Sequence, residues 1–185
     1  SSSERFPGSI MLRFYQGWQS YIVCDDDDPR LMKIDLSNGS LSAHLGVVGM
    51  PGRTAYFGLK EVGKPQEGET LVVAAASGAV GSAVGQIAKI LGLRAVGIAG
   101  GPKKCAYVRD ELGFDDCIDY KEEGFTERLR ESCPNGVDIY FENVGGKVTK
   151  AVAPLLNAGA RYQFVVISQT ITMKILLRLK HHFIY

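Results

Sequence analysis

Short apolar runs alternate with amphipathic segments along residues 70–167. The apolar runs have the length of buried strands, and the amphipathic segments have helical spacing. The predicted strands are 71–75, 95–99, 116–119, 137–141 and 161–167, and the predicted helices are 79–91, 103–112, 125–132 and 147–156. Strands that alternate with helices predict a parallel sheet covered on both faces. Right-handed crossovers then favour an α/β, doubly wound fold of the Rossmann type.

The pattern is less regular before residue 70 and after residue 171. Residues 17–23 alternate in character and predict a strand, and residues 53–62 have helical spacing after Pro51 and Gly52. We expect Gly63 and Pro65 to end that helix. The apolar and basic segment 172–185 favours a helix followed by a short strand. Residues 25–28 are all aspartates and could form a cation site. They lack the glycine and terminal glutamate of a calcium loop, which favours a solvated loop.

Composition narrows the class of protein. The chain has 185 residues, of which 45% are hydrophobic, enough for one core or one core and a partial second. The net charge of +1 gives no global basic field, so we expect no nucleic-acid partner and no anionic membrane partner. No apolar run approaches the roughly 20 residues that span a bilayer.

The cysteines and histidines predict neither a disulfide framework nor a metal site. The four cysteines form no Cys-x-x-Cys pair, and the three histidines supply no zinc-ligand spacing. Free thiols are typical of a reducing compartment, and no signal-peptide pattern opens the chain. We therefore expect a cytoplasmic protein.

A glycine turn follows the first predicted strand of the alternating region. Ala76, Gly78 and Gly81 occupy the three positions of G-x-G-x-x-G, between a buried strand and a helix. The middle glycine lets the backbone approach a pyrophosphate, the third lets the helix pack on the strand, and the helix N-terminus attracts phosphate. This context predicts a dinucleotide site at residues 78–81. The alternative is a tight structural turn without a ligand.

The end of the second strand favours NADP over NAD. An NAD site usually has Asp or Glu there to bind the ribose 2′-hydroxyl, but this strand ends in Gly100 and Gly101. Lys103 and Lys104 follow, within reach of a 2′-phosphate, and a lysine pairs strongly with phosphate. The alternative is that these lysines are solvated surface residues.

Two further residues follow strands of the predicted sheet. Tyr120 comes after the third strand, where it could cover the adenosine-phosphate pocket or be an ordinary half-buried tyrosine. Asn143 comes after the fourth strand, where ligands bind at the carboxyl edge of a doubly wound sheet. An asparagine before two glycines is also typical of a turn, so both interpretations stay open.

Several segments resemble one known family. They are residues 17–19, 48–59, 68–81, 113–115 and 138–146. Together they resemble the prostaglandin reductases, also called leukotriene 12-hydroxydehydrogenases, which include bacterial curcumin reductase. These enzymes form a zinc-independent branch of the medium-chain dehydrogenase/reductase superfamily. The resemblance extends over about residues 16 to 161.

The resemblance implies NADPH-dependent reduction of the carbon–carbon double bond of an α,β-unsaturated ketone or aldehyde. Hydride would pass from the nicotinamide to the β-carbon, hydrogen bonds would stabilise the enolate, and a proton would follow at the α-carbon. It names no catalytic side chain in this sequence. It assigns the pyrophosphate to Gly78, Ala79 and Val80, next to Gly81 of the same cofactor site. It assigns the 2′-phosphate to Lys104 and Tyr120, the ribose or nicotinamide to Asn143, the nicotinamide face to Met50 and Thr54, and the cofactor loop to Ile167 and Ser168.

The chain also departs from the family. Family members are longer, and Thr170 stands where they have an aromatic residue. We therefore expect residues 1–50 to be a partial catalytic domain and residues 51–185 an NADP-binding Rossmann domain whose C-terminal part is incomplete. The alternatives are a quinone reductase of the same superfamily and a non-catalytic NADP-binding fragment. Relatives use the sheet edge for dimers, so a homodimer is an expectation.

Overall fold

A computed structural model describes residues 10–13, 20–25 and 27–164 of the chain. The strands are β1 (Met11–Arg13), β2 (Leu31–Lys33), β3 (Thr70–Ala74), β4 (Arg94–Ala99), β5 (Asp116–Asp119), β6 (Val137–Glu142) and β7 (Leu156–Phe164). The α-helices are α1 (Leu41–Leu45), α2 (Met50–Phe57), α3 (Ala79–Ile90), α4 (Pro102–Ala106), α5 (Phe125–Ser132) and α6 (Lys147–Val152). Short 3₁₀ turns cover Leu36–Asn38 and Ala153–Leu155, and π-helical turns cover Gly58–Gly63 and Tyr107–Glu111.

The central sheet has five strands in the order β5-β4-β3-β6-β7, all parallel. Within this sheet, the first strand in sequence is the central strand β3. The chain then adds β4 and β5 on one side of β3, and β6 and β7 on the other side. This order is that of the first five strands of the classical dinucleotide-binding sheet. The sequence-based prediction of an α/β, doubly wound fold is confirmed.

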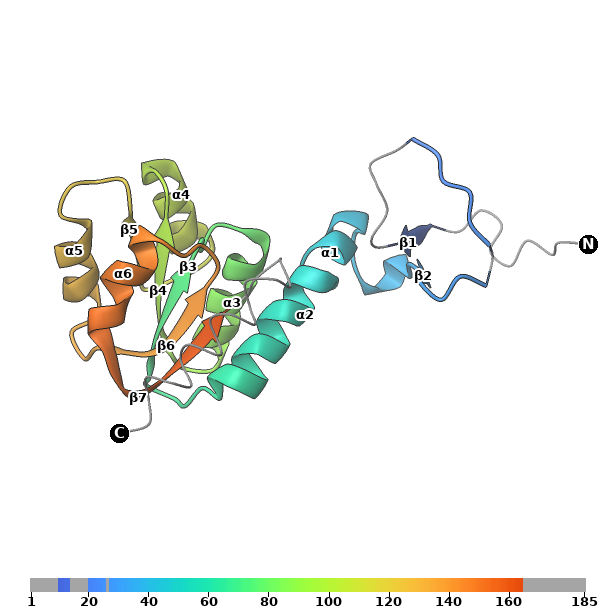
Figure 1. The fold of residues 1–185 in the computed structure, drawn as a ribbon. Coiled ribbons are helices and arrows are strands. Elements are labelled where there is room, and N and C mark those ends of the chain that lie inside the picture. The colour runs from blue at the N-terminus through green and yellow to red at the C-terminus, as the bar shows by residue number, and fades with distance from the viewer. Residues whose placement is uncertain (1–9, 14–19, 26, 165–185) are drawn as a thin grey trace, which may run out of the picture.

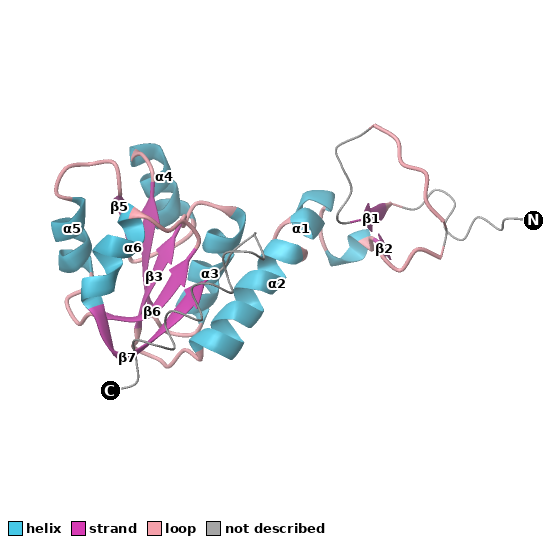
Figure 2. Cartoon of the chain, viewed as in Figure 1, coloured by secondary structure: helices cyan, strands magenta, loops and turns pink. Residues whose placement is uncertain are grey.

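Helices cover both faces of the sheet (Figures 1 and 2). Alternate residues of each strand point to opposite faces, so Leu71 and Val73 join one core and Val72 and Ala74 the other. The first core packs against α2, α3 and α4, and the second against α5 and α6. All five residues of β3 are buried. The strands are apolar throughout because both of their faces are covered.

Three predicted helix boundaries differ from the structure. Pro51 and Gly52 do not precede the helix but lie in the first turn of α2, where a proline loses no helical hydrogen bond. The predicted helix 103–112 changes from α4 to a π-helical turn at Tyr107. The predicted helix 147–156 ends as an α-helix at Val152, because Pro154 cannot continue it, and β7 begins at Leu156 rather than at 161.

The N-terminal part forms a small antiparallel hairpin of β1 and β2, apart from the central sheet (Figure 1). The predicted strand 17–23 is wrong over residues 20–23, which form no strand, and residues 17–19 lie outside the described residues. Asp28 pairs with Arg13 and Arg30, so arginines neutralise the described end of the acidic run. The predicted elements of 172–185 also lie outside the described residues.

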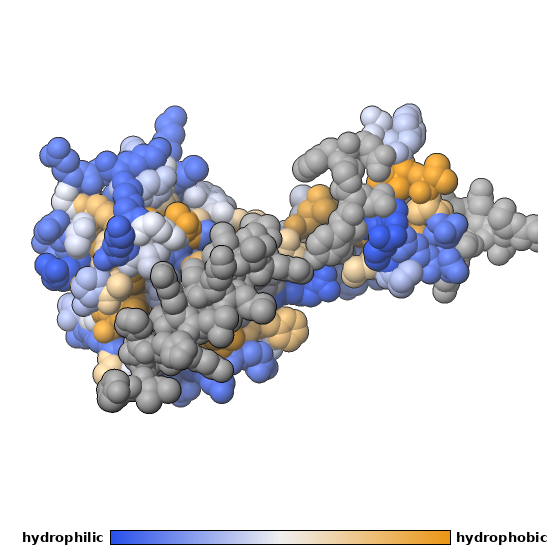
Figure 3. Space-filling view, in the orientation of Figure 1, coloured by the Kyte–Doolittle hydropathy of each residue, from blue (hydrophilic) through white to orange (hydrophobic). Residues whose placement is uncertain are grey.

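The surface differs between parts of the molecule. Figure 3 shows mainly hydrophilic residues over α4 and α5, and apolar residues mixed with hydrophilic ones around α1 and α2. Exposed apolar side chains on or beside α1 and α2 are Leu41, Leu45, Val47, Val48, Met50, Tyr56 and Phe57. Among the described residues, no helix has both the length and the apolar character that crossing a membrane requires.

Candidate cofactor site

The turn between β3 and α3 brings backbone very close to backbone. A Cβ added to Gly81 would lie 2.4 Å from the carbonyl oxygen of Ala75 and 3.0 Å from the Cα of Ala76. Any side chain there would push α3 away from the end of β3. The third fingerprint glycine therefore has the packing role that the sequence pattern predicts.

The left-handed residue of this turn is Ala75, with φ of +51°. Ala76, at the first fingerprint position, is fully buried and does not have a positive φ. An alanine is accommodated there because the unusual backbone angle is one residue earlier. Non-glycine residues with left-handed backbone angles cost free energy, and they cluster at active sites and ligand sites.

The N-terminus of α3 is open to an anion. Gly78 is the N-cap residue, and no side chain caps the helix. Within the described residues no side chain accepts from the first N–H groups of α3, and the partial positive charge of a helix of 12 residues is directed at the turn. The N–H of Gly78 donates to the Ala75 carbonyl oxygen at 2.9 Å, so residues 79–81 present the backbone donors where a pyrophosphate would bind.

A cavity of about 180 Å³ lies beside this turn, at the carboxyl ends of the strands. Lys104 from α4 and Tyr120 from the end of β5 both line it, so the fold brings together the two residues assigned to a 2′-phosphate. Its full lining is Ala75, Ser77, Ile98, Ala99, Gly100, Lys104, Tyr120, Lys121, Val144 and Val148. The apolar residues suit an adenine ring, and the lysines suit a phosphate.

Sequence reasoning missed Ser77 and Lys121 in this lining. Ser77 directly precedes the assigned residue Gly78, and Lys121 directly follows the assigned residue Tyr120. This proximity in sequence is the feature from which they could have been predicted. Lys103, by contrast, does not line the cavity. Hydrogen bonds from the backbone N–H groups of Gly101 and Lys121 hold the pKa of the nearby Asp119 below its ordinary value.

Tyr120 packs directly on Gly100, the residue that follows β4. A Cβ added to Gly100 would lie 2.9 Å from the Cε1 atom of the Tyr120 ring. Gly100 therefore has a second role besides leaving the strand end without a carboxylate: any side chain there would displace the Tyr120 ring. A second contact comes from Lys147, whose Nζ donates a hydrogen bond of 2.7 Å to the Tyr120 carbonyl oxygen.

Asn143 joins two strands at the carboxyl edge. Its Nδ2 donates a hydrogen bond of 2.8 Å to the carbonyl oxygen of Ala74, at the end of β3. Gly145 and Gly146 follow with positive φ angles, as the turn interpretation requires. Asn143 does not line the 180 Å³ cavity. The structure therefore gives it a definite role in the turn.

Glu142, which sequence reasoning did not single out, organises this turn from inside the protein. Its carboxylate is 1% exposed and accepts hydrogen bonds from the Tyr140 hydroxyl at 2.5 Å and from the Thr149 hydroxyl. The backbone N–H groups of Val144 and Gly145 donate at 2.5 and 2.7 Å. Burial raises the pKa of Glu142, but these hydrogen bonds outweigh it and hold the pKa below its ordinary value. A buried carboxylate thus fixes the backbone that follows Asn143.

The remaining assigned residues lie elsewhere. Met50 and Thr54 lie in α2, where the Thr54 hydroxyl donates a hydrogen bond of 2.8 Å to the Met50 carbonyl oxygen, and neither lines the 180 Å³ cavity. Met50 is 53% exposed. Ile167 and Ser168 lie outside the described residues.

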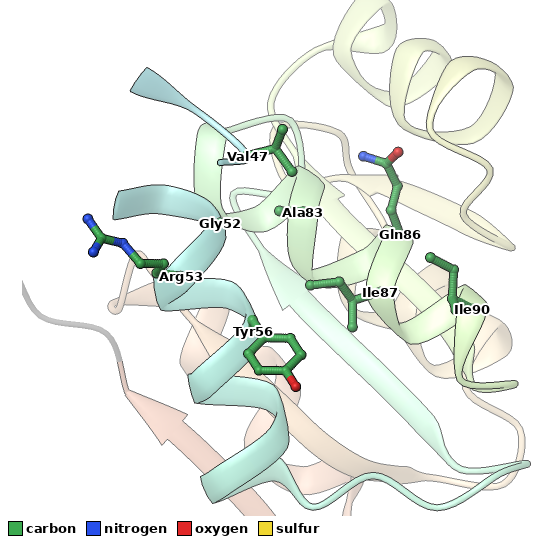
Figure 4. A pocket seen from close by; sticks show the side chains of 8 residues that line it. All are labelled: Val47, Gly52, Arg53, Tyr56, Ala83, Gln86, Ile87 and Ile90. Carbon is green, nitrogen blue, oxygen red and sulfur yellow. The ribbon is translucent and has the colours of Figure 1, made fainter. Parts of the chain in front are cut away.

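A larger groove, of about 430 Å³, lies between α2 and α3. Figure 4 shows its lining: Tyr56 and Ile87 face one another across it, whereas Arg53 points away. The other lining residues are Val47, Gly52, Ala83, Gln86 and Ile90. None of the residues assigned to the cofactor lies here, and the lining is mostly apolar. Among the described residues that line it, the only cation is Arg53, which points away from the groove, whereas Lys104 and Lys121 both line the smaller cavity.

The chain matches a known protein family over more than half of its length. The family described as zinc-binding dehydrogenase matches residues 79–180, more than half of the chain. The chain belongs to this family. Within the described ranges, no three His, Cys, Asp or Glu side chains cluster closely enough to hold a metal ion.

Two relatives with described activities are similar to most of this chain. The chain is 55% identical over 147 residues to an NADPH-dependent curcumin reductase of Escherichia coli, covering 80% of this chain and 42% of that protein. It is 47% identical over 153 residues to the NADP-dependent 2-alkenal reductase of Nicotiana tabacum, covering 82% of this chain and 44% of that protein. The family resemblance found in the sequence is confirmed. The chain spans less than half the length of both relatives.

A solved structure is similar as well. The structure of CurA from Vibrio vulnificus in complex with NADPH superposes with a TM-score of 0.70 at 48% sequence identity. The match covers 83% of this chain and 50% of that chain. The turn and the 180 Å³ cavity described above therefore occur in a fold that also binds NADPH in a relative.

Proposed function

We propose that this chain supplies the NADPH-binding part of a reductase that reduces the carbon–carbon double bond of α,β-unsaturated ketones or aldehydes. One observation carries the proposal: Lys104 and Tyr120 line one cavity beside the uncapped N-terminus of α3. The curcumin and 2-alkenal reductases named above support the cofactor and the class of substrate. The proposed partner is a small enone or alkenal.

In this proposal the residues divide the dinucleotide among them. The backbone of 78–81 binds the pyrophosphate, Lys104 binds the 2′-phosphate, and Tyr120 covers the same pocket. Asn143 lies toward the ribose, Met50 and Thr54 toward the nicotinamide, and the loop with Ile167 and Ser168 completes the site. When bound, NADPH supplies the hydride. The chain's own contribution is to bind the cofactor in one orientation and to shield it from water.

The organisation of the molecule is part of the proposal. We assign residues 1–50 to part of a catalytic domain and residues 51–185 to the NADP-binding domain. The buried thiols of Cys105, Cys117 and Cys133 are free, which supports a reducing, cytoplasmic compartment. A homodimer through the sheet edge at β7 is also proposed, and sedimentation equilibrium tests it.

A titration of the purified chain with NADPH and with NADH tests cofactor binding. We expect tighter binding of NADPH, since only NADPH has the phosphate that Lys104 would pair with. Lys104→Met should remove most of the preference, and Lys103→Met, its neighbour outside the cavity, should keep it. Equal affinities in the unmodified chain would contradict the role of Lys104.

NADPH oxidation measured with an enone, an alkenal and a quinone tests the reaction. Turnover of the enone or alkenal supports the proposal, and turnover of the quinone alone would replace it with a quinone reductase. NADPH binding without turnover of any of them would show that this chain is a non-catalytic cofactor-binding fragment.

A further inference from the structure

Lys147, the first residue of α6, reaches a residue 27 positions earlier in the chain. Its Nζ donates a hydrogen bond of 2.7 Å to the carbonyl oxygen of Tyr120 and lies 4.9 Å from the centroid of the Tyr120 ring. One ammonium group thus contacts both the backbone and the aromatic face of the same residue. The two contacts join the end of β5 to the start of α6.

These contacts span the cavity at the carboxyl edge. Tyr120 and Lys121 line it from the end of β5, and Val144 and Val148 line it from the segment around the start of α6. β4 and β3 stand between β5 and β6 in the sheet, so no strand hydrogen bond links these two walls. Lys147 is a direct link between them.

Lys147 itself is not among the residues that line the cavity, whereas Lys104 and Lys121 are. Its ammonium is directed to Tyr120. The Tyr120 ring is held on Gly100, where a Cβ would clash with it, and by the ammonium of Lys147. The cation–π contact favours one position of the ring, and the charged hydrogen bond to the carbonyl oxygen holds the backbone that carries the ring.

We propose that Lys147 is a positioning residue for the 2′-phosphate pocket, acting through Tyr120. The inference rests on the proposed function, because it takes the cavity to bind the adenosine end of NADPH. Lys147 keeps Tyr120 in the orientation in which it covers the phosphate. The start of α6 then contributes to the choice between NADPH and NADH.

A matched pair of variants separates this role from a general loss of charge. Lys147→Met removes both contacts, and Lys150→Met removes the same charge from an exposed position one turn further along α6. Binding of NADPH and NADH is titrated at one ionic strength, and each variant's melting temperature is recorded. We expect K147M to raise the Kd for NADPH about fivefold to tenfold, with little change for NADH. K150M should behave like the unmodified chain.

A double-mutant cycle tests the route through Tyr120. In a Tyr120→Leu background, Lys147→Met should add little further loss of NADPH affinity, because the ring it positions is gone. Lys147→Arg, which keeps the cation, should restore most of the affinity. An undiminished effect of K147M in the Y120L background would overturn the proposal, as would an equal loss for NADPH and NADH.

The outcomes also distinguish this inference from the proposed function. If the unmodified chain prefers NADPH and K147M equals K150M, the role of Lys147 is overturned and the proposed function stands. If the unmodified chain does not prefer NADPH, both are overturned.

Discussion

Gly81 is the residue at which a single added carbon matters most to the candidate cofactor site. Because a Cβ there would lie 2.4 Å from the Ala75 carbonyl oxygen, Gly81→Val has to displace α3 from the end of β3. We expect NADPH binding to be lost in a titration, while circular dichroism still shows a folded chain. Gln86→Ala, on the exposed side of the same helix, is the control and should bind normally. Unchanged affinity in Gly81→Val would remove the argument from the glycine turn.

Glu142 makes a prediction about acid stability. Its pKa in the folded protein lies below its ordinary value, so its contribution to the free energy of unfolding is present above about pH 4.5 and is lost as the pH falls through the folded pKa. Glu142→Gln should lower the free energy of unfolding at pH 7 by about 1–3 kcal/mol, because two backbone N–H groups lose a charged acceptor. It should also flatten the decline toward low pH.

Urea unfolding at pH 7 and at a series of pH values below 4.5 measures both effects. Glu127→Gln, at an exposed position of α5, removes the same charge without touching this network and should change neither quantity by much. If the two variants had the same pH dependence, the buried hydrogen bonds would not be the cause.

At the scale of elements, Arg161 ties the last strand to the start of the sheet. Its Nε donates a hydrogen bond of 2.7 Å to the Gly63 carbonyl oxygen, and its guanidinium pairs with Glu69. The hydrogen bond from Arg161 holds the pKa of Glu69 below its ordinary value. Arg161→Met should therefore lower the free energy of unfolding by about 1–3 kcal/mol.

Arg128→Met offers the contrast in the same unfolding experiment. Arg128 pairs with Glu122 at the surface, where both side chains are close to half exposed. Exposed pairs contribute about 0–1 kcal/mol, so this variant should stay close to the unmodified chain. If both variants lowered the free energy of unfolding equally, the Arg161 contacts that anchor β7 would stabilise the protein no more than an exposed ion pair does.

At the scale of the whole molecule, stability should be uneven. The five-stranded sheet lies between two apolar cores, whereas β1 and β2 are three-residue strands paired only with each other. Hydrogen exchange followed by mass spectrometry should show β3 and β4 protected longest and β1 and β2 exchanging first. Equal protection of β1, β2 and the central sheet would contradict the proposed division between residues 1–50 and the Rossmann domain.

The sequence alone determined the class of fold and the site's central turn. The strands of a doubly covered sheet are continuous apolar runs, and a glycine turn between strand and helix has a local signature, so both are visible in a short window of sequence. Lys104 and Tyr120 were also predictable, since each follows a strand and carboxyl ends of parallel strands meet at one edge.

Tertiary structure decided what local patterns cannot carry. The start of β7 was misplaced because the pairing of β7 with β6, not the apolar spacing, sets that boundary. The roles of Glu142 and Lys147 could not be predicted from the sequence. Glu142 is a charged residue that can be buried only because several segments supply its hydrogen-bond donors, and Lys147 contacts a residue 27 positions away. Contacts of that kind exist only once the sheet order β5-β4-β3-β6 has brought the walls of the cavity together.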